Sequence, residues 1–345
     1  MLQAFSDNAI YAKCRSFFGE RLTPADYGEM MKKSSVSEVA ACLKESTHYR
    51  DVLSGADEGT IHRGQLENLL RNEKFRIYER IIQYDARRDG DFYHYIYLRE
   101  EIDQLINLLM YLSGGCDGEY FYRYSDYLKK HCAYDLDRVV LARSFDQLLE
   151  ILAGTQYAKI LEKDRPEGED RFDLAACERN LNTYYYRSLL DTIDKEFSGE
   201  TRRALHRLFL ERIDAENIAG AYRLRRFFKN TPDSIRLNLL PFETPSRKLI
   251  DDIIASGTPA ELEQVLRHSQ LGEMMEEGDI QFIENITHRL RNHLSKRYIW
   301  YSSHPPVVMV ALMTQLDLEL ENLINIIESI RYGLDPAEMK KLLVI

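Results

Sequence analysis

The stretch LAACERNLNTYYYRSLLDTI (residues 174–193) decides the fold class of this chain. Its apolar side chains recur every three or four residues, which is the spacing of one buried face of an α-helix. They are Leu174, Cys177, Leu181, Tyr184, Tyr185 and Leu189. The same spacing recurs along residues 205–224 and 316–330, whereas alternating strand-like runs bounded by turn residues are nearly absent. The sequence therefore predicts an all-α protein.

Prolines mark the expected beginnings of several helices. Pro24, Pro232, Pro259 and Pro336 each follow a threonine or an aspartate. Proline fits the first helical turn, and the preceding oxygen-bearing side chain can accept a hydrogen bond from an otherwise unpaired backbone N–H. The start TPAD at residues 23–26 looks like TPAE at residues 258–261, which prompts a search for internal repeats.

Three segments share one pattern: a short apolar helix, a hydroxyl residue, and an aromatic or apolar anchor two positions later. These pairs are Thr47 with Tyr49, Thr155 with Tyr157, and, in a weaker third copy, Ser269 with Leu271. The copies lie about 105 to 115 residues apart, which is typical of repeated domains larger than solenoid units. We therefore predict three related helical units at residues 1–118, 119–234 and 235–345, separated near the glycine cluster 114–118 and the segment 232–245.

A second pattern closes each predicted unit. Asp214 precedes Asn217 by three residues, and Glu319 precedes Asn322 by the same distance. The first unit has Asp103 in this register, but an isoleucine takes the place of the amide. We expect both asparagines near the apolar faces of their helices, where a buried amide needs hydrogen-bond partners and fixes how helices meet.

Composition and charge narrow the class of protein. The 56 acidic and 46 basic side chains leave a net charge of −10, which disfavours binding to nucleic acid. The five cysteines are odd in number and widely spaced, as expected of reduced thiols in a cytosolic protein. Asp7 and Asn8 interrupt the N-terminal apolar residues, so we expect no secretory signal. The longest apolar run, residues 307–313, is far shorter than the roughly 18 to 20 residues of a membrane span.

No pattern in the sequence indicates a catalytic, metal or cofactor site. His288 and His293 are five residues apart and diverge around a helix, so they do not form a zinc pair. The glycine cluster 114–118 lacks the Gly-Lys-Ser/Thr of a phosphate loop and is interpreted as a helix stop. The carboxylates of REEID (residues 99–103) are interpreted as a solvated helix face.

Basic residues gather in two places. The first cluster is Arg223, Arg225, Arg226 and Lys229, and the second is Arg289, Arg291, Lys296 and Arg297. Cations late in a helix complement its dipole, which accounts for them without a partner. The other interpretation is that one cluster meets an acidic partner surface.

Several stretches resemble one known family. YAKCR (residues 11–15) and RLTPADY (21–27) resemble the N-terminus of the rotary ATPase subunit known as d in eukaryotic V-type enzymes and as C in prokaryotic A/V-type enzymes. ELENL (319–323), continuing to RYGLDP (331–336), looks like the closing helix of that family, and IDAENI (213–218) extends the resemblance across the chain. The resemblance implies a pseudo-threefold funnel of three similar helical domains, which sits on the proteolipid ring and receives the central stalk.

The expected function is that of a non-catalytic connector between the central rotor stalk and the membrane proteolipid ring, which transmits torque for ATP-coupled proton or sodium transport. The expected partners are the stalk subunits and the ring, without nucleic acid, small-molecule substrate or cofactor. The expected place is the cytoplasmic face of the membrane, as a peripheral component. Two alternatives remain open: a helical adaptor unrelated to ATPases and an all-helical hydrolase.

Overall fold

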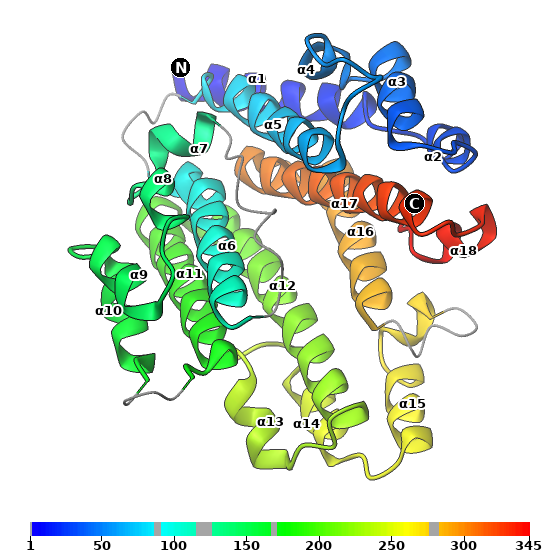
Figure 1. The fold of residues 1–345 in the computed structure, drawn as a ribbon. Coiled ribbons are helices and arrows are strands. Elements are labelled where there is room, and N and C mark those ends of the chain that lie inside the picture. The colour runs from blue at the N-terminus through cyan, green and yellow to red at the C-terminus, as the bar shows by residue number, and fades with distance from the viewer. Residues whose placement is uncertain (1, 86–90, 115–125, 167–170, 276–282) are drawn as a thin grey trace. The chain divides into compact units, whose positions relative to one another are not determined.

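The computed structural model describes the chain except residues 1, 86–90, 115–125, 167–170 and 276–282 (Figure 1). The described residues form helices α1 to α18 and a few short 3-10 turns, with no strand, which confirms the predicted all-α class. They divide into two compact units: unit 1 comprises residues 1–88 and 266–345, and unit 2 comprises residues 89–265. These boundaries are not those of the three repeat units proposed from the sequence, which stay a prediction.

Unit 1 contains both ends of the chain and is organised around α17. This helix packs against α16, α1 and α5, which run beside it (Figure 1). The helices of unit 1 are α1 (Leu2–Gly19), α2 (Pro24–Met30), α3 (Val36–Ser46), α4 (Arg50–Leu53), α5 (Arg63–Ile82), α16 (Ile283–Tyr301), α17 (Pro305–Arg331) and α18 (Pro336–Lys341), with the 3-10 turn η4 (Gly272–Met274).

The core of unit 1 joins the beginning of the chain to its end. Leu43 of α3 and Leu66 of α5 are fully buried in the same cluster as Leu323 and Ile326 of α17. Burying each such side chain contributes about 1.5 to 3 kcal/mol. The apolar run at residues 307–313 is the first part of α17 and is buried throughout. Within the described residues, no helix is both long enough and apolar enough to cross a membrane.

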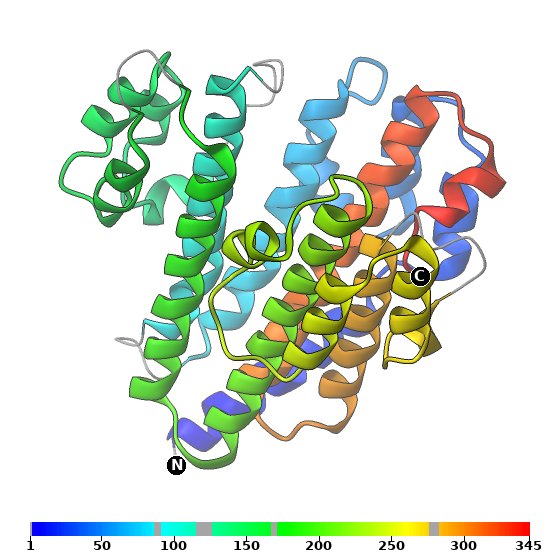
Figure 2. The same ribbon diagram turned by 90° about the horizontal axis from the view of Figure 1, so that it is seen from below.

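Unit 2 is built on three long helices with short ones beside them. Helix α11 packs between α6 and α12, and the short helix α10 packs against α11 (Figure 2). The elements of unit 2 are η1 (Phe92–His94), α6 (Tyr95–Leu112), α7 (Asp126–His131), α8 (Leu136–Val139), α9 (Phe145–Ile151), α10 (Gln156–Leu161), η3 (Glu162–Asp164), α11 (Leu174–Glu196), α12 (Gly199–Arg226), α13 (Pro232–Asn238) and α14 (Arg247–Ala255); α15 (Pro259–Arg267) crosses the boundary between the units.

The helix starts and stops follow local chemistry. The four prolines named above are each the first residue of a short helix, as predicted. Gly114 adopts a left-handed conformation (φ +82°) directly after the end of α6, which confirms it as a helix stop. The rest of the glycine cluster, residues 115–118, lies outside the described part of the chain. The four cysteines in the described part are free thiols.

Candidate functional site: three buried carboxylates that join helical modules

Three short-helix modules begin with the same hydrogen bonds. In each, a hydroxyl residue caps the helix and accepts a hydrogen bond from the backbone N–H three residues later, at 3.2 to 3.3 Å. The side chain of that later residue accepts a bond, at 2.7 to 2.8 Å, from the N–H preceding the cap. The pairs are Ser35 with Glu38 (module A, α3 and α4), Ser144 with Gln147 (module B, α9 and α10) and Thr258 with Glu261 (module C, α15 and η4).

This geometry changes the comparison of helix starts made from the sequence. Thr23, which was matched to Thr258, caps α2 through a different set of bonds, because its own N–H donates to Asp26 at 2.7 Å. The closer counterparts of Thr258 are Ser35 and Ser144, which have no following proline.

The hydroxyl residues of the repeat pattern close the first helix of each module. Thr47, Thr155 and Ser269 each donate to a carbonyl three or four residues earlier, at 2.6 to 2.7 Å. Thr47 and Ser269 also accept a bond from the N–H two residues later, at 3.2 and 3.1 Å. The anchor that follows is buried in all three copies, as Tyr49, Tyr157 and Leu271.

Glu319 of α17 forms the first joint, in unit 1, and is fully buried. The N–H of Leu22 donates to its Oε2 at 2.8 Å, and the hydroxyl of Tyr49 donates to its Oε1 at 3.1 Å. Two cations approach as well: the Nε2 of His48 lies 3.2 Å from Oε1, and the Nε of Arg21 lies 3.5 Å from Oε2. Helix α17 is thereby bonded to module A through Tyr49 and to the segment before module A through Leu22.

The same carboxylate sets the protonation of His48. Burial alone would lower the pKa of this imidazole, but the hydrogen bond and the charge of Glu319 outweigh burial and raise the pKa above its ordinary value of 6.5. Burial, together with the charge of Glu319, raises the pKa of Tyr49, so its hydroxyl stays a donor. The joint therefore holds a buried carboxylate that favours the protonated form of His48, lies near Arg21, and accepts hydrogen bonds from a backbone N–H and a neutral tyrosine.

We expect the free energy of unfolding of unit 1 to fall as pH rises above 6.5 and through the folded pKa of His48. The folded state binds this proton more tightly than the unfolded state, so the contribution is fully present below pH 6.5 and is lost above the folded pKa. His48→Gln should flatten this part of the profile, whereas His293→Gln, at an exposed position of α16, should not. Urea unfolding at several pH values measures the effect, and an unchanged slope in the His48 variant would contradict it.

Glu101 of α6 forms the second joint, in unit 2. The N–H of Ala133 donates to its Oε1 at 2.9 Å, and the hydroxyl of Tyr157 donates to its Oε2. The hydroxyl of Tyr134 donates to the backbone carbonyl of Glu101 at 2.7 Å. Burial raises the pKa of the Glu101 carboxyl, and these donors oppose that rise. Module B is thereby bonded to the preceding long helix.

The position of Glu101 corrects two sequence interpretations. The carboxylates of residues 99–103 are not all on a solvated face, because Glu100 and Glu101 are 7% and 4% exposed. Asp103, which the sequence register matched to Asp214 and Glu319, instead pairs with Arg99 one turn earlier. The residue that makes the joint was missed because a buried carboxylate and an exposed one look the same in sequence.

Asp214 of α12 forms the third joint, also in unit 2, and is 4% exposed. The N–H of Ser246 donates to both carboxylate oxygens, at 3.1 and 3.3 Å, and Thr244 adds a side-chain hydrogen bond. Burial raises the pKa of Asp214, and these bonds oppose the rise. Glu101 is thus bonded to the segment before module B, and Asp214 to the segment before module C. Glu319, the last of the three acids, is bonded to the segment before module A.

Asn217 and Asn322 each hold a backbone segment by two hydrogen bonds. Asn217 donates to the carbonyl of Leu240 at 3.1 Å and accepts from its N–H at 2.8 Å. Asn322 donates to the carbonyl of Val344 at 2.8 Å and accepts from its N–H at 2.9 Å. Both amides are buried, 5% and 3% exposed, and the held residue follows by 23 and 22 positions. Each amide therefore has the same structural role in its unit, which is to fix a later backbone segment against a long helix.

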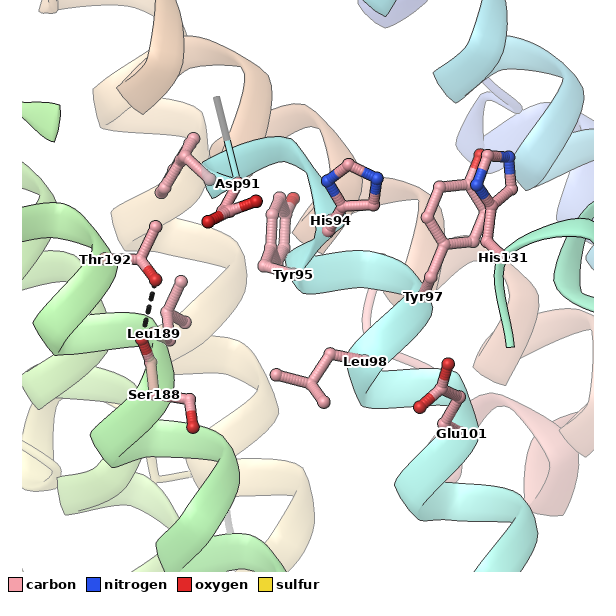
Figure 3. A pocket seen from close by; sticks show the side chains of 11 residues that line it. Asp91, His94, Tyr95, Tyr97, Leu98, Glu101, His131, Ser188, Leu189 and Thr192 are labelled. Atoms are coloured by element: carbon pink, nitrogen blue, oxygen red, sulfur yellow. Dashed lines mark hydrogen bonds between the residues drawn. The ribbon is translucent and has the colours of Figure 1, made fainter. Parts of the chain in front are cut away.

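A pocket of 240 Å³ adjoins the Glu101 joint in unit 2 (Figure 3). The ring of His131 stacks on Tyr97 with centroids 4.2 Å apart, and His94 faces His131 at 6.1 Å. Glu101 lines the same pocket, but both of its carboxylate oxygens already accept hydrogen bonds. Among the residues that the structure describes, no three His, Cys, Asp or Glu side chains are grouped to hold a metal ion.

The first basic cluster lies at the end of α12. The side chain of Arg225 is used within the fold, because it donates to the carbonyls of Ser256 and, at 3.4 Å, Asn230. Lys229 has a left-handed backbone (φ 52°) and is exposed. No hydrogen bond or ion pair joins Arg226 or Lys229 to another described side chain. Phe227 and Phe228 beside them are 55% and 69% exposed.

The fold is therefore that of an all-α protein built of helical modules. A buried acid on a long helix bonds to the segment before each module. This chain belongs to the ATP synthase (C/AC39) subunit family, whose family model matches residues 10–342. It is also similar to the C subunit of the A-type ATP synthase of Methanosphaera stadtmanae, with 36% identity over 84 residues. That match covers 24% of this chain and 22% of the relative.

Family membership confirms the resemblance seen in the sequence and identifies the chain as a subunit of an ATP synthase or V-type ATPase. An adaptor unrelated to ATPases is therefore set aside.

Proposed function

We propose that this chain is a non-catalytic connector that links the central rotor stalk to the membrane proteolipid ring and transmits torque between them. The observation that carries the proposal is the closed series of joints. Glu101 and Asp214 bond to the segments that lead into modules B and C, and Glu319 bonds back to the segment that leads into module A. The recurrence of this joint along the chain supports three repeat units, at residues 1–118, 119–234 and 235–345. The family resemblance implies their arrangement around a pseudo-threefold axis.

The mechanics of the joints suit a body that carries torque. A torque-transmitting body must resist bending between its parts, and buried, fully bonded polar networks rigidify the contacts that they span. The Glu319 joint combines a backbone N–H, a tyrosine and two cations. Three-part symmetry cannot match every subunit of a ring of different symmetry, so the repeats meet unequal neighbours. The replacement of the tyrosine anchor by Leu271 in module C agrees with such divergence.

The end of α12 is the surface that we propose for the stalk. Arg226 and Lys229 lie beside Phe227 and Phe228, and Leu237 of α13 is 69% exposed. Aromatic and arginine side chains are enriched at protein interfaces. In a chain of net charge −10, this cluster favours an acidic surface on the partner.

We expect the tagged full-length chain, purified from its native membranes in mild detergent, to bring with it the central-stalk subunits and a proteolipid ring. Mass spectrometry of the co-purified proteins measures this. The association would place the chain at the cytoplasmic face of the membrane as a peripheral component. Purification of the chain without other ATPase subunits would contradict the connector function.

The variant Arg226→Glu/Lys229→Glu should lower recovery of the stalk by about tenfold, because it reverses the charges of a half-buried arginine and an exposed lysine and leaves the internally bonded Arg225 in place. Recovery of the ring should not change. Arg202→Glu/Arg203→Glu, at the exposed beginning of α12, is the matched control. Equal loss of stalk in both variants would show that α12's end is not the stalk surface.

A further inference from the structure

An aromatic tip closes the α16–α17 hairpin of unit 1. Trp300 and Tyr301 end α16 and are 57% and 85% exposed, and Tyr301 is the most exposed large apolar side chain in the described part of the chain. The tip is held in place from α1: the guanidinium of Arg15 donates to the carbonyls of Ile299 and Trp300, at 3.2 and 2.8 Å. Phe18 meets the indole edge to face at 5.7 Å. These contacts fix the indole of Trp300 and the last turn of α16, so the exposed rings do not lie on a frayed helix end.

Unpaired cations accompany these rings. Lys296 lies one turn before Trp300, and Arg297 one turn before Tyr301, so the four side chains gather on adjacent faces of the same two turns. Neither cation forms an ion pair with another described residue. Burial lowers the pKa of Lys296, and the nearby charge of Arg21 lowers it further. No Asp or Glu occurs in residues 285–316, although the chain has 56 acids.

The other members of the second basic cluster are used within unit 1. Arg289 donates to the carbonyl of Met274 at 2.8 Å, and Arg291 lies 3.9 Å from a carboxylate oxygen of Glu321. Contacts within unit 1 thus account for Arg289 and Arg291. No comparable contact with a described residue accounts for Lys296 and Arg297 at the aromatic tip.

The α11–α12 hairpin of unit 2 shows that the fold does not require this tip. It also joins two long helices by a short loop, and α12 carries a joint acid as α17 does. Its loop aromatic, Phe197, is 8% exposed, and Asp194, Glu196 and Glu200 flank it. The helix dipole explains cations late in α16, but it does not explain outward aromatic rings. The composition of the α16–α17 tip therefore indicates that the tip binds a partner outside the chain.

We propose that the α16–α17 tip, formed by Lys296, Arg297, Trp300 and Tyr301, binds an anionic lipid surface. Tryptophan and tyrosine favour the boundary between headgroups and acyl chains, where an apolar ring and a polar edge are both satisfied. Adjacent Lys and Arg side chains add attraction to anionic headgroups. Long basic side chains can keep the charged group in water while their aliphatic stems lie along apolar surface. A side chain that protrudes with 85% exposure suits insertion into a deformable surface better than docking on a rigid one. The proposal is independent of the stalk surface at α12.

The sequence supplies its own probe, because Trp300 is its only tryptophan. With vesicles of phosphatidylcholine containing about 30% phosphatidylglycerol, the full-length chain should co-sediment and the Trp300 emission should shift to the blue. With phosphatidylcholine alone neither should occur, and added salt should weaken binding. Lys296→Glu/Arg297→Glu should reduce partitioning by about 25-fold or more, and Tyr301→Ser should reduce it less.

Lys340→Glu/Lys341→Glu is the matched control, because it reverses two exposed cations on α18 of the same unit. Circular dichroism of each variant establishes that it is folded. Equal loss of binding in the control would show a diffuse charge effect and overturn the assignment to this tip. A blue shift with soluble polyglutamate, but none with anionic vesicles, would show that the tip binds acidic protein segments and would likewise overturn the proposal.

Discussion

Replacing Glu319 with alanine should lower the free energy of unfolding of unit 1 by about 3 to 5 kcal/mol, the usual cost of removing one partner from a buried charged network. The substitution leaves the Leu22 N–H, the Tyr49 hydroxyl and the His48 imidazole without their common acceptor. Glu319→Gln keeps the shape and one acceptor oxygen, so it should cost less than the alanine variant. Urea unfolding followed by Trp300 fluorescence reports on unit 1, which contains the tryptophan.

Glu321→Ala is the control on the same helix. The side chain of Glu321 is 38% exposed and lies 3.3 Å from His288 and 3.9 Å from Arg291, so these ion pairs are worth about 0 to 1 kcal/mol. If Glu319→Ala and Glu321→Ala had the same effect, Glu319 would not be the joint that connects the ends of the chain. Glu319→Ala should also remove most of the pH dependence of the unfolding free energy assigned to His48, because the raised pKa of His48 depends on the Glu319 carboxylate.

The helices were predictable from the sequence because their burial is periodic. In α11, Cys177, Leu181, Tyr185 and Leu189 are buried at the predicted spacing, and the helix begins at Leu174 as the pattern indicates. Each short helix that begins with proline has a side chain before it that can cap the first turn. These signals are local, so they can be read without knowing what the helix packs against.

The joints were only partly predictable because they depend on distant backbone groups. Tyr49, Tyr157, Asp214 and Glu319 were selected from the repeat pattern, but the N–H donors at Leu22, Ala133 and Ser246 have no signature in the sequence. One weak feature of the sequence points to Glu101 as a joint residue. Glu101 precedes Tyr157 by 56 residues, within one residue of the spacing from Asp214 to Leu271.

The register error at Asp103 has the same origin. An alignment of Ile102 with Ile213 places Asp103 opposite Asp214, but Ile106 then stands where the other units have an asparagine, which argues against that register. A carboxylate one turn after an arginine forms a local pair, as Asp103 does with Arg99, and is then unavailable to a distant partner. Spacing between pattern elements was therefore a better guide than the identity of the neighbouring apolar residue.

Asn322→Ala should lower the free energy of unfolding of unit 1 by about 2 to 4 kcal/mol, because it leaves the buried N–H and carbonyl of Val344 without partners. The loss should begin locally: Leu343 packs in the core of unit 1 and Val344 is 7% exposed, so the last residues should open before the rest of the unit. Hydrogen exchange at the Val344 amide measures this opening, and it should rise far more than exchange in the middle of α17.

Two further asparagines make the prediction specific. Asn325→Ala removes a single bond, to the carbonyl of Leu342 at 3.0 Å, from a partly buried site on the same helix and should cost about 0.5 to 1.5 kcal/mol. Asn217→Ala should open the Leu240 amide in unit 2 to the extent that Asn322→Ala opens Val344, because the two amides make the same pair of bonds. Matching protection changes at Leu240 and Val344 would support equivalent positions in related repeats. A large change at Val344 with none at Leu240 would mean that the shared geometry is not a shared structural role, and it would weaken the case for three repeats.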